Sequence, residues 1–253
     1  MRTLAVIPAR LGATRLPRKP LRLLAGQPLI LRVLERVAAM RVADACVVAT
    51  DSEEIAAAVR GGGGEAVLTS AEHPSGTDRV AEVAALPAYR GYDAIVNVQG
   101  DEPFVDREAV LGAAAMVSER GFPLGTAAAP ADTSILEAPH VVKVVAADDG
   151  RAMYFSRAPI PYLRDAGDRA LLAGRVRQHV GVYAYAREAL ARWVALPPHP
   201  LEQIERLEQL RPLAAGLAMG VATVAGPVRG GIDTEDDLAR ANADWMTFTG
   251  TMS

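Results

Sequence analysis

The sequence has almost no cysteine and no net excess of positive charge. It has one cysteine, Cys46, so no internal disulfide can form. The apolar run 45–49 around this cysteine predicts a buried strand residue in preference to a reactive thiol. A formal net charge of −3 gives no global basic field, so tight non-specific binding to nucleic acid is not expected. Any anion that the chain binds must be held by a local cluster of cations.

Long apolar runs and glycine-rich nucleotide motifs are also missing. The chain has no run of about 18 apolar residues, and its first eight residues are too short for a secretory signal. We therefore expect a cytoplasmic protein without membrane insertion. Neither a Walker A pattern nor G-x-G-x-x-G follows the first apolar run, and the missing glycines argue against an NAD enzyme.

Lysine is nearly absent, because Lys19 and Lys143 are the two lysines in a chain with 25 arginines. Base composition of the coding DNA or chance could explain this ratio. The functional interpretation is that a compact ammonium is required at these two positions, where a planar guanidinium would not serve.

Short β-rich runs alternate with helical patterns over the first 120 residues. The predicted strands are 3–7, 45–50, 66–69 and 94–99. The predicted helices are 28–40, with Pro28 in its first turn, then 78–86 and 107–119. A further helix is expected after Asp51, which resembles an N-cap with Glu54 three residues on, and glycines 61–64 end it. This alternation predicts a largely parallel sheet with helices on both faces, in which ligands bind beyond the carboxyl ends of the strands.

The second half of the chain departs from simple alternation. The runs 141–147 and 151–155 flank a predicted hairpin turn at 148–150. Strands are predicted at 180–185 and 221–224, an amphipathic helix at 201–213, and a closing helix at 234–245 with Asp237 three residues after its Thr234 cap. No repeat, linker or low-complexity segment is visible. We expect one domain, 1–253, with an antiparallel excursion near 150–185.

A basic loop follows the first predicted strand. Four cations fall within ten residues at positions 10–19: Arg10, Arg15, Arg18 and Lys19. Arginine offers forked contacts to phosphate, and lysine offers a point charge. A solvated basic loop is the plainer interpretation. The position after a strand favours an anion site such as one for a triphosphate.

Two aspartates follow predicted strands elsewhere in the chain. Asp101 comes directly after the strand 94–99, and Asp233 lies between a strand and a helix. An ordinary turn or helix cap would explain either one alone. Together with the basic loop they suggest a site for Mg²⁺, which prefers carboxylates, phosphates and water as ligands.

Other polar segments have both plain and functional interpretations. In the segment 73–79, Asp78 and Arg79 could be first-turn helix charges, and an N-cap role would explain Asp51. His179, Gly181 and Tyr183 would share one strand face. Glu205, Glu208 and Gln209 would lie on one side of the helix 201–213, where a solvated face is the plainer explanation.

Seven motifs of this sequence together resemble the 3-deoxy-manno-octulosonate cytidylyltransferases, the CMP-Kdo synthetases. They are P-A-R-x-x-A-T-R-L-P-x-K-P-L, H-P-S-G-T-D-R, Q-G-D-E-P, Y-F-S-R-x-x-I-P, H-V-G-V-Y, P-L-E-x-I-E-x-L-E-Q-L-R and G-I-D-T-x-x-D-L. They run from about residue 4 to about residue 240. The first motif also resembles, more loosely, the CMP-sialic acid synthetases. Two positions depart from the expected pattern: Ala13, commonly serine, and Arg18, commonly glycine.

The resemblance implies a role for individual residues. It assigns to CTP binding the positions Arg10, Thr14, Arg15, Lys19, Ser75, Gly76, Thr77, Arg79, Gln99 and Asp101. It assigns to the sugar Gln99, Arg157, His179, Tyr183, Glu208 and Gln209, with Arg157 on the sugar carboxylate. Asp101 and Asp233 would ligate Mg²⁺, and Lys19 and Arg15 would complete the catalytic group. Lys143 fits the family pattern V-K-V less specifically.

The fold and function that the resemblance implies are a Rossmann-like α/β nucleotide-diphospho-sugar transferase fold with a mixed, mostly parallel central sheet, in a homodimer. The enzyme would activate 3-deoxy-D-manno-octulosonate (Kdo) with CTP, releasing pyrophosphate, for lipopolysaccharide biosynthesis. The alternatives are a cytidylyltransferase for another 2-keto acid sugar, of the sialic acid or amino-Kdo type, and a non-catalytic nucleotide-binding regulator. One or two contacts distinguish such sugars, so the sequence separates them poorly.

Overall fold

The computed structural model describes residues 1–12, 15–226 and 228–250. Thr14, a predicted nucleotide contact, lies outside these residues, as does Ala13. The chain divides into two compact units, the first formed by Met1–Arg107 with the C-terminal segment from Arg229, the second by Glu108–Val228. In the part of the chain that the structure describes, no helix combines the length and apolar character needed to cross a bilayer.

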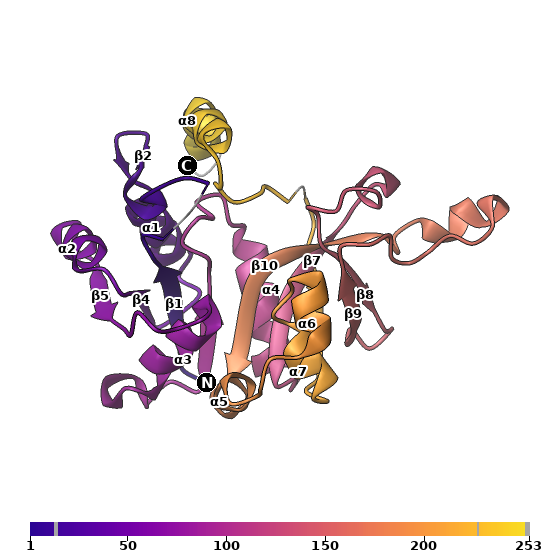
Figure 1. Cartoon of the computed structure of the whole chain (residues 1–253), viewed down its shortest axis with the longest axis horizontal. Helices are drawn as coiled ribbons and strands as arrows, with labels where there is room; N and C mark the ends of the chain where they lie inside the picture. Colours follow the sequence, from indigo (N-terminus) through magenta and orange to yellow (C-terminus); the bar gives the residue numbers. More distant parts are fainter. Residues whose placement is uncertain (13–14, 227, 251–253) are drawn as a thin grey trace. The chain divides into compact units, whose positions relative to one another are not determined.

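The first unit is built on four parallel strands in the order β6-β1-β4-β5 (Figure 1). Their bounds are β1 Thr3–Ala9, β4 Ala45–Thr50, β5 Glu65–Leu68 and β6 Ala94–Asn97. Residues 4–7 of β1 and 94–97 of β6 are buried, as expected for central parallel strands covered on both faces. The four strands predicted from the first half of the sequence are therefore confirmed, with ends shifted by one or two residues.

Helices connect these strands and pack against them. The first unit contains the helices α1 Leu29–Met40, α2 Glu53–Gly61, α3 Gly76–Ala85 and α8 Glu235–Gly250 and the short 3₁₀ turns η1 Lys19–Leu21 and η2 Pro87–Tyr89. A small hairpin, β2 Leu23–Leu24 with β3 Gln27–Pro28, precedes α1. Pro28 is the N-cap of α1 and not part of its first turn. α1 contacts β4, α2 contacts β5, and α3 contacts β1.

The predicted cap of α2 is wrong. Ser52, and not Asp51, is the N-cap, because the Ser52 hydroxyl accepts the amide hydrogen of Ile55 at 3.4 Å. Asp51 lies one residue too early to reach that amide and pairs with Arg79 across the strand ends. Glu54 belongs to the first turn of α2 and forms an ion pair with Arg18.

The second unit has mixed pairing. Its strands are β7 Leu124–Pro130, β8 Lys143–Ala146, β9 Ala152–Ser156, β10 Arg177–Ala186 and β11 Met219–Thr223. β11 runs parallel to β7, β7 is antiparallel to β10, and β8 pairs antiparallel with both β10 and β9. The hairpin at 148–150 is confirmed, with Gly150 at φ 88°. Together the two units confirm the predicted mixed, mostly parallel α/β class.

One strand of the second unit was not predicted. β7 has the sequence Leu-Gly-Thr-Ala-Ala-Ala-Pro, in which Thr126 is the one β-branched residue. α4 (Arg107–Ser118) crosses so close to it that a Cβ at Gly125 would lie 2.1 Å from the carbonyl oxygen of Ala113. The packing of α4 therefore requires small residues in β7. Because Gly and Ala have low β-propensity, the sequence of β7 does not indicate a strand.

The predicted helix 201–213 is interrupted. The chain forms α6 Pro200–Glu205, turns through Arg206 in the left-handed region at φ 55°, and forms α7 Leu210–Ala214. A proline inside a continuous helix would clash with the carbonyl four residues before it. Restarting the helix at Leu210 places Pro212 in a first turn, where it is tolerated. α5 Arg187–Val194 and the turn η3 Thr133–Ile135 complete this set of elements.

Two features of β10 and its surroundings bear on function. The register of β10 against β7 shifts between Val180 and Tyr183, which marks a β-bulge. The segment before β10 carries the 3₁₀ turn η4 (Ala166–Leu172), which lies on an arm that projects beyond the hairpin β8–β9 (Figure 1).

Candidate active site

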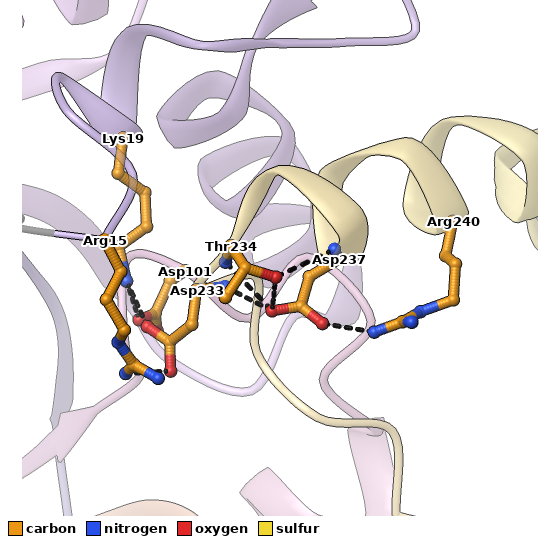
Figure 2. A network of polar contacts seen from close by, with 7 residues as sticks. All are labelled: Arg15, Lys19, Asp101, Asp233, Thr234, Asp237 and Arg240. Atoms are coloured by element: carbon orange, nitrogen blue, oxygen red, sulfur yellow. Dashed lines mark hydrogen bonds and ion pairs between the residues drawn. The ribbon is translucent and has the colours of Figure 1, made fainter.

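Lys19 lies between the two carboxylates that were predicted to bind a metal (Figure 2). Its Nζ is 2.5 Å from Oδ2 of Asp101 and 2.9 Å from Oδ1 of Asp233. All three residues belong to the first unit, although they are separated by up to 214 positions in sequence. The structure thus brings the basic loop and both acidic residues to one place, as predicted.

The electrostatics of this cluster keep Lys19 charged. Its side chain is 16% exposed. Burial by itself lowers the pKa of an ammonium, but Asp101 and Asp233 outweigh burial and raise the Lys19 pKa above its ordinary 10.5. The cluster therefore carries a permanent cation in contact with two carboxylates.

Backbone contacts position Asp101. Asp101 follows β6 in a turn, and the preceding Gly100 is pressed against the first strand, because a Cβ there would lie 2.8 Å from the carbonyl oxygen of Pro8. The amide of Ile232 donates to the carbonyl oxygen of Asp101 at 2.9 Å, and Ile232 itself is buried. A tight turn and a long-range backbone bond therefore hold this carboxylate at the strand end.

A capping arrangement positions Asp233 at the start of α8. The Thr234 hydroxyl accepts the amide hydrogen of Asp237 at 3.1 Å, and the Asp237 carboxylate accepts the amides of Thr234 and Asp233 at 2.9 and 3.1 Å (Figure 2). Burial alone would raise the Asp237 pKa, but these hydrogen bonds and Arg240 lower it. The predicted Thr234–Asp237 cap is confirmed, and it leaves the Asp233 side chain pointing toward Lys19.

The other cations of the basic loop are arranged differently from one another. Nη2 of Arg15 is 2.8 Å from Oδ2 of Asp233, and its side chain is 68% exposed. Arg10 follows β1 and is exposed. Arg18 is committed to Glu54 on α2. Arg15 therefore joins the acidic cluster, whereas Arg10 is exposed directly after β1.

Glu102 is a member of this cluster that sequence reasoning passed over. Burial raises the pKa of the Glu102 carboxyl to about 8, and the neighbouring charges of Asp101 and Asp233 contribute in the same direction. The signal was available in Q-G-D-E-P, where a second carboxylate directly follows Asp101.

The donor set suits a divalent cation. Asp101 and Asp233 offer hard carboxylate oxygens that already converge on one positive atom, the ammonium nitrogen of Lys19. Within the described residues, no group of three or more His, Cys, Asp or Glu side chains forms a complete metal site. Two carboxylates are a common protein contribution to a Mg²⁺ site, because substrate phosphates and water usually complete the coordination.

The N-terminus of α3 lies beside the end of β1. A Cβ added at Gly76 would lie 3.4 Å from the Pro8 side chain and 3.9 Å from Oε1 of Gln99, whose Nε2 donates to Asn97 at 3.3 Å. Ser75 is the N-cap: its Oγ accepts the amide hydrogen of Asp78 at 3.3 Å. The predicted nucleotide residues Ser75, Gly76 and Gln99 are thus near one another, together with the buried Thr77 on the same helix.

Arg79 is buried and holds two strand ends together. It is 3% exposed, and its Nη2 donates to Oδ2 of Asp51 at 2.9 Å while Nη1 donates to Thr69. Thr69 and Asp51 directly follow β5 and β4. Arg79 thus links the ends of β4 and β5, a structural role that was not predicted from the sequence.

In the second unit, Arg157 is anchored by backbone carbonyls. Its Nε donates to the carbonyl of Glu205 at 2.9 Å and Nη1 to that of Pro139 at 3.1 Å. The Glu205 carboxylate accepts the Arg157 amide at 2.9 Å and the Ser156 hydroxyl at 2.5 Å. Among the described residues no partner is recorded for Nη2 of Arg157, so this face of the guanidinium is available to an anion.

His179 and Tyr183 lie together on β10, as predicted. Their ring centroids are 5.5 Å apart, and Phe155 meets the His179 ring edge-on at 5.0 Å. Burial lowers the His179 pKa to about 3, so the imidazole is neutral at neutral pH. Nε2 of His179 lies 2.9 Å from Oγ1 of Thr126, a residue that sequence reasoning missed because β7 was missed.

The grouping of Glu205, Glu208 and Gln209 on one helix face is wrong, because the helix ends at Glu205. Glu205 turns to Ser156 and Arg157, whereas Glu208 and Gln209 lie in the connection before α7. Gln209 is 3% exposed, and within the described residues its Nε2 has no hydrogen-bond partner. A buried donor without a partner is costly unless a ligand supplies the acceptor.

Lys143 is fully buried and donates to three carbonyl oxygens. Nζ is 3.1 Å from the carbonyl oxygen of Ala138 and 2.9 Å from that of Val141, and it also contacts the carbonyl of Arg157. Burial, with Arg157 nearby, lowers its pKa from 10.5. These three carbonyl dipoles supply the hydrogen-bond acceptors that the buried ammonium needs.

Comparison with known proteins gives a consistent result. A family model described as Cytidylyltransferase matches residues 4–219. A 3-deoxy-manno-octulosonate cytidylyltransferase of Gemmatimonas aurantiaca is 65% identical over 245 residues, covering 97% of this chain and 95% of the relative. One from Anaeromyxobacter dehalogenans is 50% identical over 248 residues, covering 96% of this chain and 98% of the relative.

Solved structures agree with these sequence matches. A CMP:2-keto-3-deoxy-manno-octonic acid synthetase complexed with CTP superposes with a TM-score of 0.89 at 37% identity, covering 98% of this chain and 99% of that one. A 4-diphosphocytidyl-2C-methyl-D-erythritol synthase from Anaerococcus prevotii gives a TM-score of 0.61 at 16% identity, covering 97% and 98%, and shows a shared fold alone. The predicted nucleotide-sugar transferase fold is therefore confirmed.

Proposed function

The chain belongs to the cytidylyltransferase family, and on this basis we propose its substrates, its metal ion and the role of each site residue. It is a nucleotidyltransferase that activates Kdo with CTP, giving CMP-Kdo and pyrophosphate. The product would serve lipopolysaccharide biosynthesis. The observation that carries this proposal is the convergence of Asp101 and Asp233 on the Lys19 ammonium, where a triphosphate needs both a metal and a fixed cation.

At phosphorus the reaction forms one P–O bond and breaks another. The anomeric hydroxyl oxygen of the sugar attacks the α-phosphorus of CTP, the bond between the α- and β-phosphates breaks, pyrophosphate leaves, and the hydroxyl proton passes to water. Such a displacement depends mainly on positioning and charge neutralisation. No residue becomes covalently modified.

Lys19 and Arg15 act on the triphosphate. Both already contact Asp233, and both can exchange a carboxylate oxygen for a phosphate oxygen by rotating their flexible side chains. Lys19 gives a point charge, and the exposed guanidinium of Arg15 gives forked contacts. Arg10, at the end of β1, adds a third cation to the same loop.

Asp101 and Asp233 would hold Mg²⁺. Bound there, Mg²⁺ would neutralise charge on the triphosphate. The protein's own contribution is to fix the two carboxylates, through the Asp101–Ile232 backbone bond and the Thr234–Asp237 cap.

The sugar residues lie largely in the second unit. Arg157 would bind the sugar carboxylate, since two of its nitrogens are held by backbone carbonyls and the guanidinium is therefore oriented before the sugar arrives. The buried Nε2 of Gln209 requires an acceptor, which a sugar hydroxyl would supply. Glu208, His179 and Tyr183 would contact further hydroxyls.

We also infer a homodimer that forms through the arm around η4. The arm carries Tyr162 and Leu171, which are 79% and 72% exposed, and Met153 on β9 is exposed nearby in sequence. Large exposed apolar side chains on one segment favour a contact surface. Leu171→Glu is expected to give monomers in analytical ultracentrifugation. If the wild type is a dimer and Leu171→Glu has the same sedimentation coefficient, the arm is not the interface.

A cytoplasmic location is expected, because CTP is made there.

The deciding experiment is a pyrophosphate-release panel. The four ribonucleoside triphosphates are tested against Kdo, amino-Kdo and sialic acid, with and without Mg²⁺. We expect release with CTP, Kdo and Mg²⁺ together. Faster release with sialic acid or amino-Kdo than with Kdo would identify that sugar, and not Kdo, as the substrate. Binding of CTP without turnover of any sugar would support a nucleotide-binding regulator.

A further inference from the structure

The hydroxyl of Thr126 connects His179 to the backbone of β10. Thr126 lies fully buried on β7. Its Oγ1 is 2.9 Å from Nε2 of His179, 2.7 Å from the carbonyl oxygen of Val182 and 3.3 Å from that of Val180. A threonine hydroxyl has one proton to donate and two lone pairs that accept, so the three contacts cannot all be donated by Thr126.

The proton of Thr126 belongs to the contact with Val182. A carbonyl oxygen is an acceptor only, and two oxygens 2.7 Å apart need a proton between them. The β-bulge between Val180 and Tyr183 places this carbonyl opposite Thr126. Oγ1 must therefore accept from Nε2 of His179, and the imidazole carries its proton on Nε2.

The protonation state of Nδ1 of His179 follows from that of Nε2. A neutral imidazole has one N–H, so an Nε2–H tautomer leaves Nδ1 as an acceptor. Thr126 is the one hydrogen-bond partner of the His179 imidazole among the described residues, whereas the His179 backbone amide donates to the carbonyl oxygen of Val142. Phe155 and Tyr183 contact the ring at 5.0 and 5.5 Å between centroids and restrict its rotation.

We propose that Thr126 is a positioning residue that fixes the Nε2–H tautomer of His179 and so reserves Nδ1 as an acceptor for a sugar hydroxyl. The step that brings the sugar to His179 rests on the proposed function. An acceptor nitrogen selects a group that can donate, such as a hydroxyl, and rejects a fluorine or an ether oxygen at the same place. The tautomer therefore contributes to the choice of sugar, although Thr126 itself touches no substrate.

The tautomer can be read directly in the full-length enzyme. The chain has four histidines, and the His179→Gln variant assigns the His179 signals in a long-range ¹H–¹⁵N spectrum of ¹⁵N-histidine-labelled protein. We expect a protonated Nε2 and an unprotonated Nδ1 without any substrate. A protonated Nδ1, or two exchanging tautomers, would overturn the proposal.

Variants at Thr126 test its control over the ring. Thr126→Val keeps the shape but cannot accept from Nε2, so the single tautomer is expected to be lost; Thr126→Ser is expected to keep it. The KM for Kdo is expected to rise about tenfold in Thr126→Val, the effect of one hydrogen bond, with the KM for CTP unchanged. Thr223→Val, an exposed threonine on β11, is the matched control. A Thr126→Val enzyme with the wild-type spectrum and an unchanged KM for Kdo would refute the proposal.

The assignment of the His179 proton and the proposed function are tested separately. If Thr126→Val does not fold, the spectra of the wild type and Thr126→Ser decide the assignment of the proton. If the wild type releases no pyrophosphate from CTP and Kdo, the proposed function fails, and the spectrum still tests the hydrogen-bond arrangement of Thr126 and His179.

Discussion

The amide of Ile232 donates a 2.9 Å hydrogen bond to the carbonyl oxygen of Asp101. This bond joins the residue directly before Asp233 to the other carboxylate-bearing residue, and therefore couples two chain segments more than 100 positions apart. The spacing of the two carboxylates is consequently a property of the backbone and does not depend on their side-chain rotamers alone.

Replacing either carboxylate by its amide is expected to abolish the reaction without unfolding the protein. In Asp101→Asn and Asp233→Asn, pyrophosphate release with CTP, Kdo and Mg²⁺ is expected to fall at least about a hundredfold, because charge neutralisation of the triphosphate is lost. Circular dichroism checks the fold. Asp236→Asn, an exposed neighbour on α8, is the matched control. Full activity in Asp101→Asn would remove the metal assignment.

Lys19→Arg is expected to weaken CTP binding. The ammonium fits between Asp101 and Asp233 at 2.5 and 2.9 Å, and a longer planar guanidinium cannot take that place without displacing them. We expect the dissociation constant for CTP, measured by calorimetry, to rise about tenfold. The reverse exchange Arg60→Lys on the surface of α2 serves as control. Unaltered CTP affinity in Lys19→Arg would show that either cation serves there.

His179 is expected to reduce stability in acid. Burial lowers its pKa from 6.5 to about 3, so below pH 6.5 the unfolded chain takes up a proton that the folded chain does not. The stability that comes from burying His179 in its neutral form is complete above pH 6.5 and is lost as the pH falls toward 3. Between about pH 7.5 and about pH 5, the free energy of unfolding should drop about 2 kcal/mol more in the wild type than in His179→Gln.

Urea denaturation at the two pH values measures this difference. His140→Gln, at an exposed histidine of the same unit, controls for the loss of an imidazole as such. An identical pH dependence in the wild type and His179→Gln would mean that His179 protonates freely in the folded protein.

Lys143→Met is expected to destabilise the second unit. The variant keeps most of the side-chain volume but leaves the carbonyls of Ala138, Val141 and Arg157 without their buried donor. We expect the free energy of unfolding in urea to fall by about 3 kcal/mol. Arg151→Met, at an exposed cation, should change it by less than about 0.5 kcal/mol. Equal effects of the two substitutions would argue against a structural role for Lys143.

The first unit was largely predictable from the sequence. β1, β4 and β6 are parallel strands with largely buried residues, and their continuous runs of apolar residues are typical of such strands. Because the carboxyl ends of parallel strands share one edge, the approach of Lys19 to Asp101 could be inferred from positions in sequence alone.

The second unit was less predictable, for identifiable physical reasons. β7 consists of small residues because α4 packs against Gly125, so its sequence carries little β-propensity. The break at Arg206 depends on a residue in the left-handed region, which the helical periodicity around it does not reveal. Glu205 was consequently assigned to the wrong group.

Missing β7 also concealed Thr126, and with it the partner of His179. The pairing of Arg79 with Asp51 was overlooked for a different reason. A local cap was assumed for Asp51, although Ser52 takes that role and the charge is satisfied by a residue 28 positions away. Long-range ion pairs of this kind leave no periodic pattern in a sequence.

Lys19 gives the acidic pair a counter-charge that is part of the polypeptide itself. Mutual repulsion between Asp101 and Asp233 is thereby reduced by the fold itself, so the two carboxylates can lie close together without any further cation.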